Sequence, residues 1–149
     1  MTAQQTDVHT THAITDVFEA LRQGLLARDA AAICALYLPE ALIFDLAPPL
    51  GKPIDEAELA LWLSSWAGPV ERQTRDLRIA VSGDLAVAHG FVHISAPTHE
   101  GELAAWWMRT TTLLQRRDGR WLIAHEHESV PFAMDGSDRA LMDLEPEAV

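Results

Sequence analysis

Hydrophobic residues near the start of the chain recur every three or four positions. The first such series contains Ile14, Val17, Phe18, Leu21 and Leu25. This spacing predicts an amphipathic helix over residues 14–28. Asp29 and Asp55 are each followed by helix-forming residues and are suitable N-caps, so we expect further helices over residues 30–37 and 55–66.

The hydrophobic period changes to two in the second half of the chain. Alternating apolar residues predict strands over residues 77–81, 85–95, 103–116 and 121–130, and the apolar segment 41–46 predicts a short earlier strand. Because helices come first and neighbouring strands follow, the pattern predicts an α+β protein with an antiparallel sheet.

Length and charge favour a single domain that binds neither nucleic acid nor membrane. The chain has 149 residues and a formal net charge of -11, which disfavours contact with phosphate backbones and anionic membrane surfaces. Cys34 is the only cysteine, so an intrachain disulfide is excluded. The first residues lack the basic and apolar segments of a signal peptide, so we expect a cytoplasmic protein.

Changes in composition along the chain predict its organisation. Residues 1–12 are polar and without period, which is typical of a flexible N-terminal arm. Residues 13–134 contain all the periodic segments and form the predicted domain. Residues 135–149 are acidic and form a predicted C-terminal tail.

The sequence RDGR at residues 117–120 is typical of a β-hairpin turn. A three-residue loop would place Arg109 opposite His127, whereas a two-residue loop would place Arg109 opposite Glu128. We favour the three-residue loop. It gathers the following side chains on one face of the sheet: Trp107, Arg109, Thr111, His125 and His127.

The last predicted strand has two unlike faces. Trp121 and Ile123 require a core, so a strict period of two directs the odd-numbered residues of this strand inward. The inward set then includes the histidines His125 and His127, and the outward set the acids Glu126 and Glu128. A shift by one residue would bury both carboxylates at a cost of several kcal/mol, so we expect the first arrangement.

Four further residues complete the candidate site. His89 and His93 share one face of the strand at 85–95, and Trp62 lies on the third predicted helix. Asp45 ends the apolar segment ALIFDL and is either a catalytic base or a carboxylate that caps the following loop.

The histidines admit more than one interpretation. They can form hydrogen bonds in a polar patch, or the pair His125 and His127 can chelate a metal together with a histidine of the neighbouring strand. We expect no metal, because Arg109 opposite His127 would place a fixed cation beside any bound cation. Neutral histidines beside an arginine suit an anionic or carbonyl ligand instead.

Several segments resemble a known family. WLSSWAGPV (62–70), DLRIAVSGDLAVAHG (76–90) and WWMRTTTLLQRRDGRWLIAHEHESVPF (106–132) resemble SnoaL-like, ketosteroid isomerase-like proteins of the nuclear transport factor 2-like superfamily. The resemblance covers residues 13–145. It implies a cone-shaped, cystatin-like α+β fold, with N-terminal helices packed on a strongly curved antiparallel sheet that encloses a pocket. Members of the family are commonly homodimers that pair through the outer sheet face.

The resemblance extends to one residue with a role. In ketosteroid isomerases the short first strand ends in an aspartate that shuttles a proton, and Asp45 falls at that position. The protonated acid of those enzymes has no counterpart, because this chain reads TTTLL at 110–114. Their helix-one tyrosine is also missing, since the only tyrosine is Tyr37.

Three functions follow as alternatives. The first is a cofactor-free isomerase, lyase or hydratase for a small apolar carbonyl compound, with Asp45, His125 or His127 as acid or base. The second is a non-catalytic pocket for a small apolar or anionic ligand, and the third is an association domain. The candidate ligand-binding residues are Arg109, Trp107, Trp62, His89, His93 and Thr111.

We also expect a homodimer that forms through the outer sheet face. In the favoured register this face carries Met108, Thr110 and Thr112, whose small polar and apolar side chains suit contact between two sheets.

Overall fold

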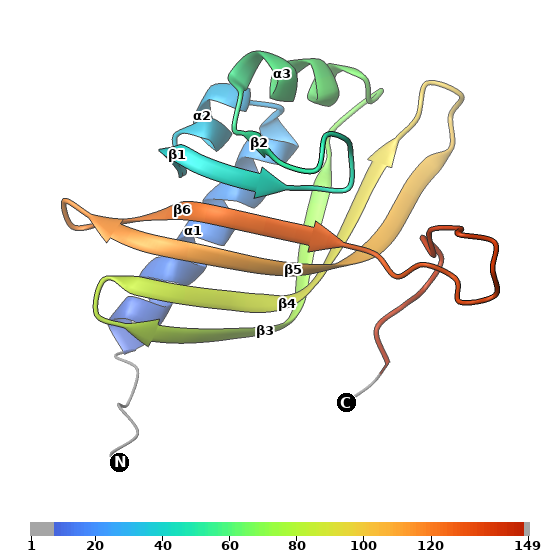
Figure 1. Ribbon diagram of the computed structural model, residues 1–149. Helices are drawn as coiled ribbons and strands as arrows, with labels where there is room; N and C mark the ends of the chain where they lie inside the picture. Colours follow the sequence, from blue (N-terminus) through green and yellow to red (C-terminus); the bar gives the residue numbers. More distant parts are fainter. Residues whose placement is uncertain (1–7, 148–149) are drawn as a thin grey trace.

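The computed structural model describes residues 8–147, and in this range three helices accompany a six-stranded sheet (Figure 1). The helices are α1 (Val8–Ala27), α2 (Ala30–Cys34) and α3 (Glu56–Ser64). The strands are β1 (Tyr37–Phe44), β2 (Lys52–Pro53), β3 (Glu71–Ser82), β4 (Leu85–Pro97), β5 (Leu103–Arg117) and β6 (Arg120–Ser129). No described helix is long and apolar enough to cross a membrane.

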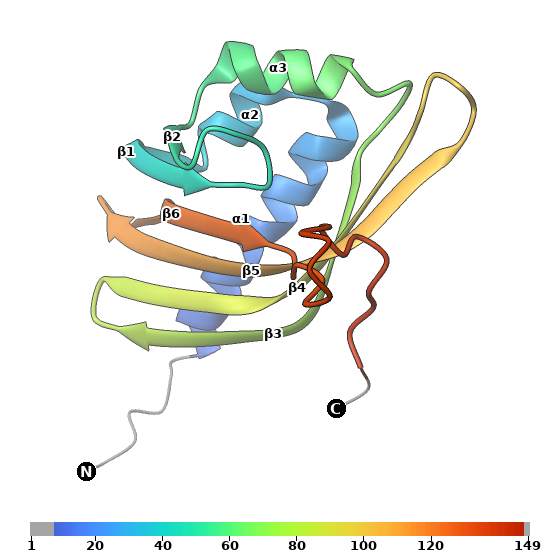
Figure 2. The same ribbon diagram turned by 45° about the vertical axis from the view of Figure 1, so that its right-hand side comes forward.

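The strands follow the order β2-β1-β6-β5-β4-β3, and the sheet is strongly curved without closing into a barrel. The long strands pair antiparallel, whereas β1 and β6 pair parallel. All the helices lie on one side of the sheet, with α3 beyond β1 and β2 (Figures 1 and 2). The predicted α+β fold with helices on a curved, mostly antiparallel sheet is therefore confirmed.

The core lies between α1 and the concave face of the sheet. The predicted helical stripe of α1 is buried, and Ile14 is fully covered. Opposite it lie apolar residues of the long strands, among them Val92 of β4, Leu114 of β5 and Ile123 of β6, all without solvent exposure. Burial of these side chains removes apolar surface from water and holds helix and sheet together.

The predicted N-caps are confirmed. The Asp29 carboxylate accepts a hydrogen bond from the Ala32 amide at 2.9 Å. Asp55 does the same for the Glu58 amide at 2.8 Å. Each bond satisfies one of the free amides in the first helical turn.

The strands predicted over 41–46 and 77–81 extend over Tyr37–Phe44 and Glu71–Ser82, and two predicted helix boundaries were also wrong. α1 begins at Val8, so residues 8–12 are helical rather than part of an arm, and residues 1–7 lie outside the described range. α2 ends at Cys34, because the chain joins the sheet at Tyr37, whose neighbour Leu36 accepts a backbone hydrogen bond from Ile123. Pairing with β6 here outweighs the local helical preference.

The turn between β5 and β6 has two residues rather than three. Arg117 pairs with Arg120, and both central residues, Asp118 and Gly119, have positive φ angles of 50° and 77°. Asp-Gly with positive φ at both positions is typical of a type I′ turn. The favoured three-residue loop was therefore wrong.

A β-bulge at Ala124 then reverses the faces of β6. Leu114 pairs with Ile123, but Leu113 pairs with His125, so Ala124 is an extra residue without a partner in the ladder. An inserted residue moves every later side chain to the opposite face. Trp121 and Ile123 are buried as expected, whereas the residues after the bulge have the opposite orientation from that predicted.

A second bulge, between β3 and β4, requires a glycine. The register shifts between Arg75 and Arg78, and a Cβ added at Gly90 would lie 2.9 Å from the backbone oxygen of Arg75. We expect Gly90→Ala to lower the free energy of unfolding by about 1–3 kcal/mol, because the opposing backbone must move. Urea denaturation measures this. The exposed Ala80→Ser on β3 serves as control, with an expected change below about 0.5 kcal/mol; an equal effect of both substitutions would contradict the prediction.

Candidate functional site

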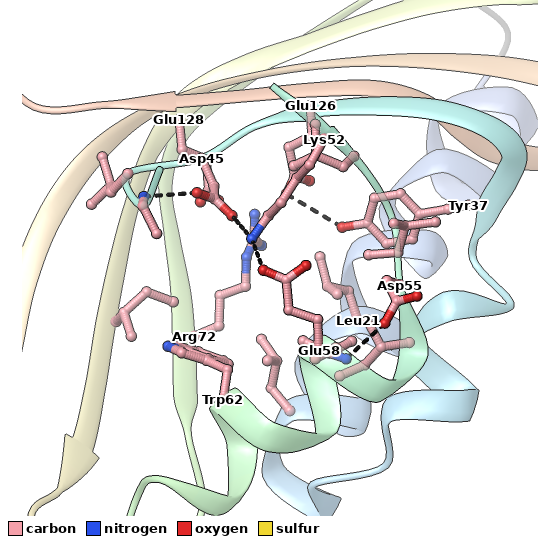
Figure 3. Close-up of a pocket in the computed structure, with 18 of the residues that line it drawn as sticks. Leu21, Tyr37, Asp45, Lys52, Asp55, Glu58, Trp62, Arg72, Glu126 and Glu128 are labelled. Atoms are coloured by element: carbon pink, nitrogen blue, oxygen red, sulfur yellow. Dashed lines mark hydrogen bonds and ion pairs between the residues drawn. The ribbon is translucent and has the colours of Figure 1, made fainter. Parts of the chain in front are cut away.

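A pocket of about 300 Å³ lies between the helices and the concave face of the sheet (Figure 3). This volume is at the lower end of the range for small-molecule sites. Its wall is mainly apolar. Among its apolar members are Leu21, Leu25, Ile33, Ile43, Leu59, Trp62, Ile94 and Met108. The pocket therefore suits a small ligand with an apolar body.

Two acidic residues of β6 line this pocket. Glu126 pairs with Ile43 in the sheet, and Glu128 follows it by two positions on the same face. Glu126 is only 6% exposed, and its Oε1 accepts a hydrogen bond from the Tyr37 hydroxyl at 3.3 Å. Its Oε2 is buried and has no hydrogen-bond partner in the described part of the chain. A buried oxygen without a partner is costly, so a bound ligand or water would stabilise it.

The environment raises the pKa of both acids. Burial raises the pKa of Glu128 from its ordinary 4.5 to about 8, and the charges of Glu126 and Asp45 act in the same direction. Burial also raises the pKa of Glu126, although the positive charge of Arg72 opposes this effect. At neutral pH, Glu128 therefore carries a proton that it can donate.

Asp45 belongs to a chain of charges near the opening of the pocket. Its Oδ2 lies 3.2 Å from Nζ of Lys52, and its Oδ1 accepts a hydrogen bond from the Ala47 amide at 2.7 Å. Nζ of Lys52 also lies 2.6 Å from Oε1 of Glu58 on α3. The pKa of Lys52 is raised. The hydrogen bond to Glu58 has the largest effect, and the contact with Asp45 acts in the same direction. These contacts fix the position of the Asp45 carboxylate, a group of the kind that acts as a general base.

Arg72 of β3 supplies the buried positive charge of the pocket. Its side chain lines the cavity, and the residue is only 4% exposed. Its Nη1 donates a hydrogen bond to Oγ1 of Thr74 at 3.2 Å, and its guanidinium lies 5.7 Å from the centre of the Phe18 ring. Within residues 8–147, no carboxylate forms an ion pair with Arg72. Its remaining N–H groups are therefore available to a ligand.

Of the residues predicted for the site, Asp45 and Trp62 line the pocket. The others lie on the opposite, outer face of the sheet, as their pairing shows: His89, His93, Trp107, Arg109, Thr111, His125 and His127. The prediction that His125 and His127 point into the pocket was wrong, as was the outward orientation of Glu126 and Glu128. The bulge at Ala124 is the physical reason for both errors.

The residues that were predicted to share one face of the sheet do share a face, but it is the outer one. Phe44 contacts both His125 and His127, with ring centres 4.7 Å and 5.6 Å apart. Nδ1 of His125 also lies 2.5 Å from the Leu42 carbonyl oxygen, so this ring donates to the backbone of β1. These contacts give His125 a structural role on the outside of the sheet.

Neither hairpin register predicted the neighbour of Arg109. This residue pairs with Ser129, and its Nε donates a hydrogen bond to Ser129 Oγ at 3.1 Å. The two-residue turn and the bulge each move the register by one residue, so the favoured partner, His127, lies opposite Thr111 instead. Arg109 therefore stands outside the pocket, and the buried cation of the site is Arg72.

The predicted role of Arg109 in excluding a metal from the histidines was wrong. Arg109 does not face His127, so it cannot exclude a cation in the predicted way. Across residues 8–147, no group of three or more His, Cys, Asp or Glu side chains is placed to hold a metal ion.

The sequence did not identify the following polar residues of the pocket as site residues: Tyr37, Lys52, Asp55, Glu58, Arg72, Glu126 and Glu128. A signal was present only in β6, where the acids Glu126 and Glu128 follow the apolar segment WLIA; Arg72 lies in a polar part of the sequence, and Tyr37 is uncharged. Buried charges are uncommon unless they are paired or functional.

Comparison with known proteins gives the same fold. The SnoaL-like domain family matches residues 12–133. An NTF2-like protein of unknown function from Pseudomonas putida KT2440 is 28% identical, with a TM-score of 0.81 over 94% of this chain and 99% of that chain. No curated protein matches this chain.

Two more distant structures carry names that point to an activity. A candidate scytalone dehydratase from Novosphingobium aromaticivorans is 13% identical, with a TM-score of 0.77 over 98% of this chain and all of that chain. A candidate dehydratase of the NTF2-like family from Streptomyces avermitilis is 16% identical, with a TM-score of 0.72 over 86% of this chain and all of that chain. At this identity the likeness shows the fold alone.

Proposed function

This chain belongs to the SnoaL-like domain family, and we propose that its pocket catalyses proton transfer in a small, largely apolar carbonyl compound without a cofactor. The observation that carries the proposal is a carboxylate in an ion pair beside a carboxyl group whose pKa is raised. Asp45 is ion-paired with Lys52, whereas Glu128 holds its proton to about pH 8. Environments that separate two carboxyl groups in this way assign one as base and the other as acid.

The two acids lie next to each other because of the parallel pairing of β1 and β6. Phe44 pairs with His127, and the residues that follow them are Asp45 and Glu128. Figure 3 shows both side chains directed into the same cavity. A substrate carbonyl can therefore contact the acid while its α-carbon lies near the base.

The reaction would begin when the Asp45 carboxylate removes a proton from the α-carbon. The electrons of the broken C–H bond form a carbon–carbon double bond, and negative charge develops on the carbonyl oxygen. Glu128 stabilises this charge by donating its hydrogen bond in a site of low dielectric constant. Asp45 then holds the proton. Its return to another carbon gives isomerisation. In dehydration the enolate electrons re-form the carbonyl and a carbon–carbon double bond as the β-hydroxyl group departs, and Asp45 gives its proton to that group to release water.

The candidate dehydratases among the similar structures support the second outcome. A non-catalytic pocket for the same class of ligand is the alternative function. Proton exchange separates the two. The protein is incubated in D₂O with a panel of small ketones and β-hydroxy ketones, and NMR follows deuterium incorporation at the α-carbon. Binding of a ketone without exchange would favour the non-catalytic pocket and contradict the enzyme.

We further propose that the protein is a homodimer that pairs through the outer sheet face. The residues first assigned to this face, Met108, Thr110 and Thr112, are buried on the inner side. The outer face instead carries aromatic residues, with His93 and Trp107 in ring contact at 4.9 Å. Aromatic side chains are enriched in protein interfaces.

Light scattering should give twice the chain mass of 16.4 kDa. A Trp107→Glu variant should reduce the mass to that of the monomer, because it places a charge within the contact. An Ala20→Glu variant, on the exposed surface of α1, should leave the mass unchanged. A monomeric wild type at micromolar concentration would refute the dimer.

A further inference from the structure

The buried guanidinium of Arg72 has few partners in the protein. The Thr74 hydroxyl and the Phe18 ring are the contacts found for it in the described range. Neither is negatively charged. A buried arginine without a carboxylate partner is costly, because desolvation of the charge is not offset by an ion pair. Arg72 is therefore suited to bind an anionic group of a ligand.

The acids around Arg72 do not fill this role. Asp45 and Glu58 are already held by Lys52 at 3.2 Å and 2.6 Å. Glu128 carries a proton at neutral pH, and burial favours the neutral form of Glu126 as well. None of these acids lies within ion-pair distance of Arg72 in the described range, so the guanidinium has no direct carboxylate partner.

Several hydrogen-bond donors of the pocket remain for a ligand. The free N–H groups of Arg72 and the protonated carboxyl group of Glu128 are donors, so both suit acceptor groups of a ligand. The indole Nε1 of Trp106, another residue of the lining, is buried and has no partner within residues 8–147. A planar carboxylate matches the fork of a guanidinium and accepts several hydrogen bonds at once.

We propose that the pocket binds a small organic acid, whose carboxylate pairs with Arg72 while its apolar body contacts the aliphatic and aromatic wall. This inference rests on the proposed function and names its substrate class as an acid that also bears the reacting carbonyl or hydroxyl group. The carboxylate would hold the substrate by a group that does not react. Asp45 and Glu128 would then act on the other end of the substrate.

A cationic ligand is the competing occupant, since the lining contains several acids. An amine would lie in the same small cavity as Arg72 and Lys52. Both cations would repel it. The geometry of the cavity therefore favours the acid.

The test compares three probes with one apolar body: 3-phenylpropanoate, 3-phenylpropanamide and 3-phenylpropylamine. Isothermal titration calorimetry on the wild-type protein at pH 7 should rank the carboxylate first, then the amide, then the amine. A charge-assisted hydrogen bond contributes about 1.5–3 kcal/mol, which corresponds to a preference of about 10–100-fold for carboxylate over amide. Equal or weaker binding of the carboxylate, or its failure to bind at millimolar concentration, would overturn the proposal.

Variants locate the preference at Arg72. Arg72→Met should abolish the preference for the carboxylate and leave the amide affinity within about threefold, whereas Arg78→Met, on an exposed position of the same strand, should retain the preference. If Arg72→Met does not fold, Arg72→Lys keeps the charge without the fork and should lose part of the preference. An unchanged preference in the Arg72 variant that folds would refute the role of this residue. Deuterium exchange with neutral ketones reports on the proposed catalysis independently, so the two hypotheses can fail separately.

Discussion

An Asp45→Asn variant is expected to lower α-proton exchange by about 10²–10⁴-fold, which is the usual contribution of a positioned acid–base residue. The amide cannot accept the proton, yet it keeps the shape of the side chain and its hydrogen bond with the Ala47 amide. Binding of a ketone probe should therefore persist. NMR measures the exchange rate in D₂O, and calorimetry measures the affinity.

The matched control is Asp84→Asn in the turn between β3 and β4. Asp84 is exposed and pairs with Arg116, remote from the pocket. This variant should exchange at the wild-type rate. Undiminished exchange in Asp45→Asn would show that another group is the base, whereas equal losses in both variants would point to a general effect on the fold.

The second large effect concerns stability and pH. Glu128 has a pKa of about 8 in the folded protein and about 4.5 when it is unfolded. Between these values the folded state binds more protons than the unfolded state. The contribution of Glu128 to stability is therefore greatest below pH 4.5, falls as the pH rises, and is lost above pH 8.

A Glu128→Gln variant should remove this decline. At pH 9 we expect the variant to exceed the wild type in free energy of unfolding by about 1–3 kcal/mol, because no buried carboxylate must then ionise. Urea denaturation at several pH values measures the difference. Glu100→Gln, on the exposed turn between β4 and β5, should follow the wild-type curve. Parallel curves for Glu128→Gln and the wild type would contradict the raised pKa.

Hydrophobic periodicity was sufficient to predict the fold because it records which side of each element is buried. The α1 stripe around Ile14 and Leu21 is buried as the spacing required. Asp29 and Asp55 mark helix starts through a local hydrogen bond, so a short sequence window contains the signal. The place of Asp45 at the end of the first strand was also predicted correctly.

Hydrophobic periodicity could not predict which way the site residues of β6 point. Period two holds only while every residue of a strand has a partner, and Ala124 breaks this condition without a glycine or proline to mark it. The expectation that burial of two carboxylates would be avoided also failed. Tyr37 and Arg72 lie far from β6 in the sequence and offset part of that cost. Sites often depart from local rules in this manner.

The extra residue at Ala124 has a consequence for evolution. Deleting this one residue would reset the phase of β6 and turn His125 and His127 toward the cavity while Glu126 and Glu128 turn outward. The chemistry of the pocket could thus change from carboxyl to imidazole without any substitution in the site. When relatives are aligned, the placement of a single gap at this position decides whether histidines or glutamates are compared as equivalent pocket residues. Inference of shared activity across the family therefore requires that the bulge be located before residue identities are matched.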